Sequence, residues 1–98
     1  MDNTVRKKIL VVDDDKLFIA TMEYWLKSRD YEVKTANDGL TALEAAKGFN
    51  PNLILLDVNM PGIDGIETLK RLREFDKETP VIIITAFIGE DRVAAASP

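Results

Sequence analysis

The chain has 98 residues, of which 46% are hydrophobic and 31% charged, and its 17 acidic and 13 basic residues give a formal net charge of −4. This composition is typical of one globular domain, and the absence of a basic stripe argues against direct nucleic-acid binding. The sequence contains neither cysteine nor histidine, which excludes disulfides, thiolate metal sites, His-ligated zinc and His-based catalysis. No apolar run is long enough for a membrane span or a signal peptide. We therefore expect a cytoplasmic protein without membrane contact.

The first predicted elements are a strand over residues 7–12 and a helix over residues 15–29. The strand ends in consecutive aliphatic residues, many of them β-branched. In the helix, acidic side chains in the first turn and Lys27 and Arg29 in the last would match the helix dipole. The apolar side chains at helical spacing are Phe18, Met22, Trp25 and Leu26.

A second strand and a second helix are expected over residues 31–35 and 39–48. The strand alternates polar and apolar side chains, which is typical of a position near the edge of a sheet. Asp38 is a candidate N-cap of the helix, and Gly48 is a candidate for the residue that follows its end. The side chains at helical spacing are Leu40, Leu43, and Ala46 or Lys47.

The third strand, residues 53–57, is an apolar run that ends in Asp57. A run of this kind between turn residues is typical of a parallel strand buried on both faces. Asp64 and Glu67 have the spacing of a capping box, so we expect a third helix from Asp64 to about Phe75.

A fourth strand is expected over residues 81–85, after Pro80, and the pattern indicates a fourth helix over residues 89–96. Strands and helices therefore alternate along the whole sequence. Strict alternation with short loops predicts an α/β fold with a parallel sheet and helices on both faces. We find no repeat or linker, so residues 1–98 are expected to form a single domain.

Polar side chains stand at the carboxyl ends of three predicted strands. Asp13 and Asp14 follow the first strand, Asp57 ends the third and Thr85 ends the fourth. If the first and third strands are neighbours, the three carboxylates meet in one crevice. Two like charges at ~4 Å repel by about 4 kcal/mol at an effective dielectric near 20, and a hard cation such as Mg²⁺ or Mn²⁺ removes this cost. The alternative is that the acids serve separate helix N-termini, which explains Asp64 well but the Asp13–Asp14 pair poorly.

Three segments resemble the receiver domain of bacterial two-component response regulators, the CheY-like family. They are residues 9–15 (ILVVDDD), 57–65 (DVNMPGIDG) and 81–86 (VIIITA), in the right order and spacing. The resemblance implies a flavodoxin-like, doubly wound parallel sheet with the strand order 2-1-3-4. It also implies a signalling domain that accepts a phosphoryl group, and not an enzyme.

The resemblance also implies roles for single residues. Asp57 matches the phosphoacceptor, which receives its phosphoryl group from a histidine kinase, a phosphotransfer protein or a small phosphodonor. Asp14 matches the direct ligand of Mg²⁺, and Asp13 matches the acid that holds the ion through a water molecule. Mn²⁺ could replace Mg²⁺. Asn59 matches the ligand that uses its backbone carbonyl. Thr85 matches the switch hydroxyl that hydrogen-bonds the phosphoryl group, although taken alone it reads as an ordinary strand residue.

The sequence departs from the family after its fourth helix. The family pattern continues with a fifth strand, a lysine at its end and a fifth helix, whereas this sequence stops at Pro98 and offers no lysine for that role. We therefore expect a truncated receiver domain, and the sequence supports metal binding more strongly than it supports signalling. The fourth strand would then be an open apolar edge, which predicts self-association, as a dimer.

Two alternatives to the phosphoacceptor function remain. One is a non-signalling receiver fragment that associates through its fourth strand without phosphorylation. The other is a magnesium phosphohydrolase with a nucleophile on the first strand, for which Asp13-x-Asp15 has the formal pattern. The second alternative also needs a substrate-covering domain, for which the chain is too short.

Overall fold

The computed structural model describes residues 5–84 of the chain. The described elements are β1 (Lys8–Val12), α1 (Lys16–Lys27), β2 (Glu32–Ala36), α2 (Gly39–Phe49), β3 (Leu53–Asp57), α3 (Gly65–Phe75) and β4 (Val81–Ile84). Each was predicted, with small shifts at the ends. The end of the fourth strand at Thr85 and the predicted helix over residues 89–96 lie outside the described residues.

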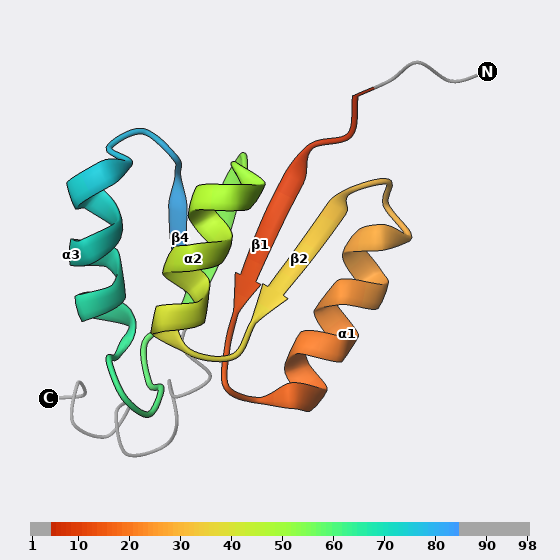
Figure 1. Cartoon of the computed structure of the whole chain (residues 1–98). Coiled ribbons are helices and arrows are strands. Elements are labelled where there is room, and N and C mark those ends of the chain that lie inside the picture. Colours follow the sequence, from red (N-terminus) through yellow and green to blue (C-terminus); the bar gives the residue numbers. More distant parts are fainter. Residues whose placement is uncertain (1–4, 85–98) are drawn as a thin grey trace, which may run out of the picture.

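The strands form one parallel sheet in the order β2-β1-β3-β4, which confirms the predicted order. The two strands at its centre, β1 and β3, pair side by side, with Val12 opposite Leu56. On the outer sides Val12 lies opposite Ala36 of β2, and Asp57 lies opposite Ile84 of β4. All carboxyl ends therefore reach one edge of the sheet (Figure 1).

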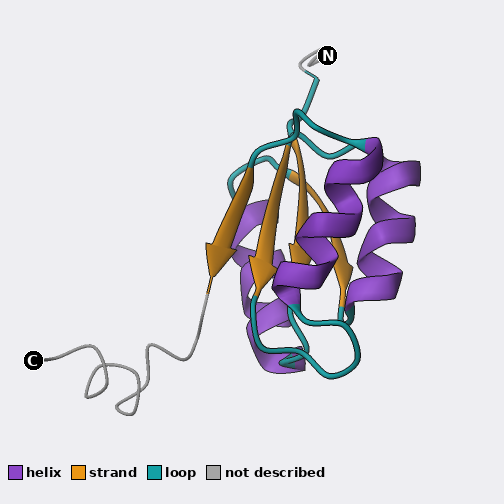
Figure 2. Cartoon of the chain, turned by 90° about the vertical axis from the view of Figure 1, so that its left-hand side faces the viewer, coloured by secondary structure: helices purple, strands orange, loops and turns teal. Residues whose placement is uncertain are grey.

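Helices cover the sheet on both faces (Figure 2). Alternate residues of each central strand point to opposite faces, so Leu10 joins the core under α2 and α3 while Val11 joins the core under α1. Both side chains are fully buried, which explains why the central strands are continuously apolar. None of the helices in residues 5–84 is long and apolar enough to cross a bilayer.

The first helix begins one residue later than predicted, because Asp15 is its N-cap. One carboxylate oxygen of Asp15 accepts hydrogen bonds from the amides of Leu17 at 3.0 Å and Phe18 at 3.2 Å. The first turn therefore holds no acidic side chain, and that prediction was wrong.

Trp25 shares the helical spacing of Phe18 and Leu26 but lies outside the core. Its side chain is 48% exposed and lies under the guanidinium of Arg29, whose carbon is 4.6 Å from the ring centre. Ile19 takes its place beside Phe18, Met22 and Leu26. The buried stripe of α1 is thus rotated toward Ile19, which leaves the large, amphipathic indole at the margin.

The second helix buries alanines, whereas the two leucines at helical spacing lie toward the surface. Ala42, Ala45 and Ala46 are buried, whereas Leu40 is 60% exposed and Leu43 is only partly buried. This helix packs against β1, β2 and α3 together. Small side chains allow the close approach that three neighbours require.

The second helix ends later than predicted. Gly48 lies inside α2, and Asn50 takes the left-handed backbone conformation at its end with φ of 52°. The amide of Asn50 donates to the Ala46 carbonyl at 3.3 Å. Asparagine tolerates this conformation, and Pro51 disfavours a helical backbone at the residue before it.

Substitutions at the end of α2 should therefore have opposite effects. We expect Asn50→Ala to lower the free energy of unfolding by about 1 kcal/mol, because the left-handed backbone strains a Cβ atom. Gly48→Ala should raise it by about 0.5–1 kcal/mol, because this helical position is open. Urea unfolding followed by circular dichroism measures both changes. An Asn50→Ala variant as stable as Asn50→Gly would show that residue 50 does not adopt the left-handed backbone conformation.

Candidate metal centre

Three carboxylates from the two central strands meet at the carboxyl edge of the sheet. Asp13 and Asp14 directly follow β1, and Asp57 is the last residue of β3. Each offers one oxygen, and these oxygens all lie within 4.8 Å of one another. The predicted meeting of Asp13, Asp14 and Asp57 is therefore confirmed, because neighbouring parallel strands bring their ends together.

The backbone holds Asp13 firmly in this cluster. Its amide donates to the Ala36 carbonyl of β2 at 3.1 Å, and its Oδ1 accepts from the Asp15 amide at 2.9 Å. The residue is 4% exposed. Asp13 is thus fixed in place, with its second oxygen left for another partner.

Asp57 carries a polar atom that the described residues leave unsatisfied. The residue is 3% exposed, and its buried Oδ1 has no hydrogen-bond partner in residues 5–84. Such an atom costs about 1–3 kcal/mol when nothing replaces its water. A buried carboxylate oxygen in a cluster of acids is consistent with a site for a cation.

Burial and like charges raise the pKa of two of these acids. Burial raises the pKa of Asp13 to about 6; the hydrogen bond from the Asp15 amide opposes this shift, and the charges of Asp57 and Asp14 add to it. Burial also raises the pKa of Asp57, against the effect of the Asn59 amide. The ionised cluster is therefore costly by itself, and a bound divalent cation would offset this cost.

The donor set fits a hard divalent cation. All available ligand atoms are oxygens, which Mg²⁺ and Mn²⁺ prefer. The Val58 carbonyl accepts the Gly65 amide at 2.9 Å, whereas no hydrogen bond within residues 5–84 occupies the carbonyl of Asn59. Among the described residues, this carbonyl, two residues beyond Asp57, is thus left without a hydrogen-bond donor.

The other acids at this edge serve helices, as the alternative interpretation predicted for Asp64. Asp15, Asp38 and Asp64 are the N-caps of α1, α2 and α3. Only one half of the predicted capping box is present: the Glu67 amide donates to Asp64 Oδ1 at 2.8 Å. The Glu67 carboxylate pairs with Arg71 instead. Since Asp15 is committed to α1, the Asp13-x-Asp15 pattern gains no support as a phosphohydrolase motif.

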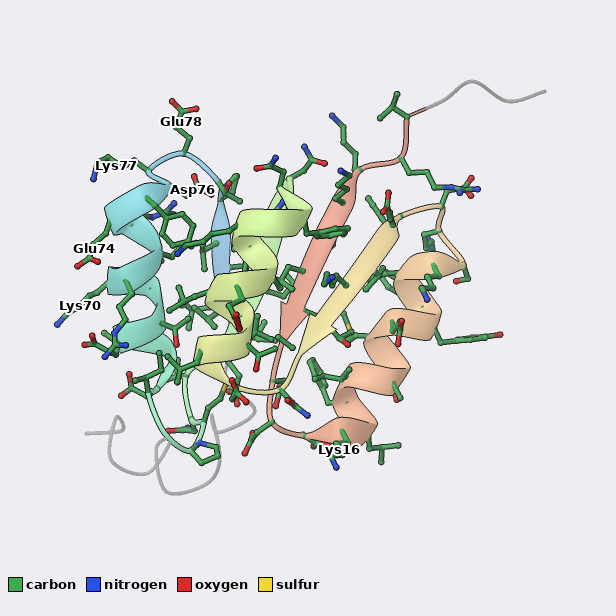
Figure 3. The ribbon with its side chains drawn as sticks, viewed as in Figure 1. Lys16, Lys70, Glu74, Asp76, Lys77 and Glu78 are labelled. Atoms are coloured by element: carbon green, nitrogen blue, oxygen red, sulfur yellow. The ribbon has the colours of Figure 1, made fainter. Side chains whose placement is uncertain are left out.

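The family lysine has no counterpart among the labelled lysines of α3 and its exit. Figure 3 shows Lys70 on the outer side of α3 and Lys77 at the end of the sheet where β4 begins. Thr85 lies outside the described residues; the last described residue of β4, Ile84, is opposite Asp57 in the sheet.

Two residues of the motif over residues 57–65 shape the site through contacts that the sequence did not predict. Met60 is 8% exposed and packs into the core under α2 and α3, so it anchors the loop after β3. Gly65, the first residue of α3, lies against the backbone of Asp57. The Asp64-Gly65 pair was visible as a turn signal, but nothing in the sequence indicated this contact.

The fold and the cluster together define a doubly wound α/β domain with a candidate cation site where its strand order reverses. The sequence profile described as "Response regulator receiver domain" matches residues 9–97, and the chain belongs to this family.

Known proteins agree with this assignment. The chain is 44% identical over 82 residues to the alkaline phosphatase synthesis transcriptional regulatory protein PhoP of Bacillus subtilis, covering 84% of this chain and 34% of that protein. It thus spans about a third of the length of this relative. The solved chemotaxis protein CheY4 of Vibrio cholerae is 33% identical, with a TM-score of 0.82 over 92% of this chain and 77% of that one.

A second solved relative is the response regulator TrrA of Thermotoga maritima. Its structure in complex with Mg²⁺-BeF is 37% identical to this chain, with a TM-score of 0.78 over 83% of this chain and 70% of that one. TrrA has also been solved in complex with the histidine kinase ThkA.

Proposed function

We propose that this chain is a cytoplasmic phosphoacceptor of a two-component system, which receives a phosphoryl group on Asp57 in a Mg²⁺-dependent reaction. The donor would be a histidine kinase or a phosphotransfer protein. The observation that carries the proposal is the buried Asp57 carboxylate, with one oxygen lacking a partner in residues 5–84, beside Asp13 and Asp14. The solved structures of TrrA, one in complex with Mg²⁺-BeF and one in complex with a histidine kinase, support it.

The chain supplies ligands of different kinds. We assign Asp14, Asp57 and the Asn59 carbonyl as direct ligands of Mg²⁺, with Mn²⁺ as a substitute, and Asp13 as a ligand through water. When bound, the cation would neutralise the acids and the charge of the incoming phosphoryl group. Thr85 would hydrogen-bond the transferred group.

The acceptor step needs no general base. An oxygen of the Asp57 carboxylate attacks phosphorus, and a new O–P bond forms as the P–N bond of a phosphohistidine or the P–O bond of an acyl phosphate breaks. The electron pair leaves with the donor. Since a carboxylate carries no proton, the requirement on the chain is that Asp57 is ionised, and its raised pKa works against this. As a signalling domain and not an enzyme, the chain is expected to hydrolyse its own phosphoaspartate only weakly.

Incubation with acetyl phosphate and Mg²⁺ tests this proposal. We expect intact-mass measurement to show one added phosphoryl group, and a chelator to prevent its addition. An unmodified chain in the presence of Mg²⁺ would overturn the proposal.

A second function, self-association through β4, is favoured by the exposure of that strand. Ile82 is 50% exposed and Ile83 is 37% exposed. They lie opposite Leu55 and Leu56, whose side chains point to different faces of the sheet, so apolar surface is exposed on both faces. Exposed apolar strands at the side of a sheet recruit further chains. We infer that β4 mediates a dimer.

The Ile83→Lys variant tests this association. We expect the unsubstituted chain to sediment as a dimer at tens of micromolar and Ile83→Lys to shift it to a monomer, because a buried lysine at the interface would be costly. Leu17→Lys, which replaces an exposed side chain of α1, is the matched control and should leave the dimer intact. A monomeric unsubstituted chain would contradict this inference.

A further inference from the structure

We propose that Gly65 is a positioning residue, whose missing side chain sets the places of the Asp57 carboxylate and the Asn59 carbonyl. The inference rests on the proposed function, because these groups are the assigned acceptor and cation ligand. Gly65 itself contributes no ligand atom.

Space, and not backbone conformation, requires glycine at this position. Among the described glycines only Gly62 has a positive φ, of 79°. A Cβ atom at residue 65 would collide with the backbone oxygen of Asp57 and lie 2.8 Å from the Cα atom of Val58. A side chain here therefore has to displace backbone at the end of β3.

Gly65 also closes the loop that carries Asn59. Its amide donates to the Val58 carbonyl at 2.9 Å, so the two ends of the segment 58–65 touch just after β3. This bond occupies the Val58 carbonyl. Because Asn59 lies between the closed end of the loop and the buried Met60, its position depends on both.

The first turn of α3 cannot easily retreat to make room for a side chain. The Thr68 hydroxyl donates to the Asp64 carbonyl at 2.7 Å, and Thr68 is 3% exposed. Thr68 packs so closely on Gly39 of α2 that a Cβ atom there would collide with its hydroxyl. With Thr68 packed on α2 and Gly65 lying against the end of β3, the backbone of Asp57 and Val58 has to absorb a change at residue 65.

Calorimetric titration with Mg²⁺ compares Gly65→Ala with two control variants. We expect Gly65→Ala to weaken binding about tenfold or more, the size of effect usual for residues that orient metal ligands. Gly48→Ala, in an open helical position, and Ile54→Val, a mild truncation of the core in β3, should bind like the unsubstituted chain. If Ile54→Val loses as much affinity as Gly65→Ala, general destabilisation explains the effect and the inference is wrong.

Amide hydrogen exchange at residue 65 gives a second readout that needs no metal. We expect the exchange to be about tenfold faster in Gly65→Ala, because the bond to the Val58 carbonyl is broken, and unchanged in both controls. If the unsubstituted chain binds no Mg²⁺, the proposed function fails, and the exchange rate alone decides the inference. An amide that stays protected in Gly65→Ala overturns it, as does an unchanged Mg²⁺ affinity.

Discussion

The Asp57→Asn variant is expected to take up no phosphoryl group from acetyl phosphate and Mg²⁺, whereas the unsubstituted chain takes up one. A carboxamide has nearly the shape of the carboxylate but lacks its nucleophilic, charged oxygen. The variant should remain folded and, without metal, be somewhat more stable, because a buried charge in an acidic cluster is removed. Intact-mass measurement gives the uptake, and urea unfolding gives the stability.

Asp64→Asn is the matched control for this loss. Asp64 is the exposed N-cap of α3 and stands outside the cluster. Asparagine caps helices about as well as aspartate, so this variant should keep both its stability and its phosphoryl uptake. A phosphorylated Asp57→Asn chain would show that the acceptor is another residue.

The second large effect is a reversal of the pH dependence of stability by Mg²⁺. In metal-free protein the pKa of Asp13 is raised from 3.8 to about 6, so the folded chain binds this proton more tightly than the unfolded chain. The resulting stabilisation is complete at low pH and is lost as the pH rises through the folded pKa. It amounts to roughly 3 kcal/mol at most. The raised pKa of Asp57 acts in the same direction.

At saturating Mg²⁺, the free energy of unfolding should instead increase as the pH rises. The cation binds deprotonated carboxylates, so it gains affinity as the pH increases through the same range. At neutral pH, a Mg²⁺ concentration of about 100 times Kd adds about 2.7 kcal/mol to the free energy of unfolding. Urea unfolding at a series of pH values, with Mg²⁺ or with a chelator, measures both slopes. If stability had the same pH dependence with Mg²⁺ as with the chelator, protons and the cation would not compete for the same carboxylates. In the Asp13→Asn variant, the loss of stability with rising pH in the absence of metal should be smaller.

The central sheet and its acids could be predicted because they follow from local patterns. Apolar runs such as residues 53–57 identify strands buried on both faces, and alternation with helices makes the sheet parallel. Parallel strands then place Asp57 and Asp13 at one edge. The strand order came from the family resemblance, and the structure confirms it.

The buried faces of the helices were harder to predict. Helical spacing defines a stripe but does not say how close the neighbouring elements come. Leu40 and Trp25 fit the spacing, yet they lie at the margins, while Ala45 and Ile19 face the sheet. The contact of Gly65 with Asp57 joins residues eight positions apart through space, so no local pattern records it.

The hydrogen bond from the Asp13 amide to Ala36 continues the ladder between β1 and β2 one residue past the end of β1. Together with the place of Asp57 as the last residue of β3, it prevents these carboxylates from spreading apart to relieve their repulsion. The backbone thus gathers these two acids of the proposed site in advance, so we expect little rearrangement of the chain on cation binding. The rate of binding should then follow how fast the ion sheds its water, so Mn²⁺ should enter faster than the reluctantly dehydrating Mg²⁺.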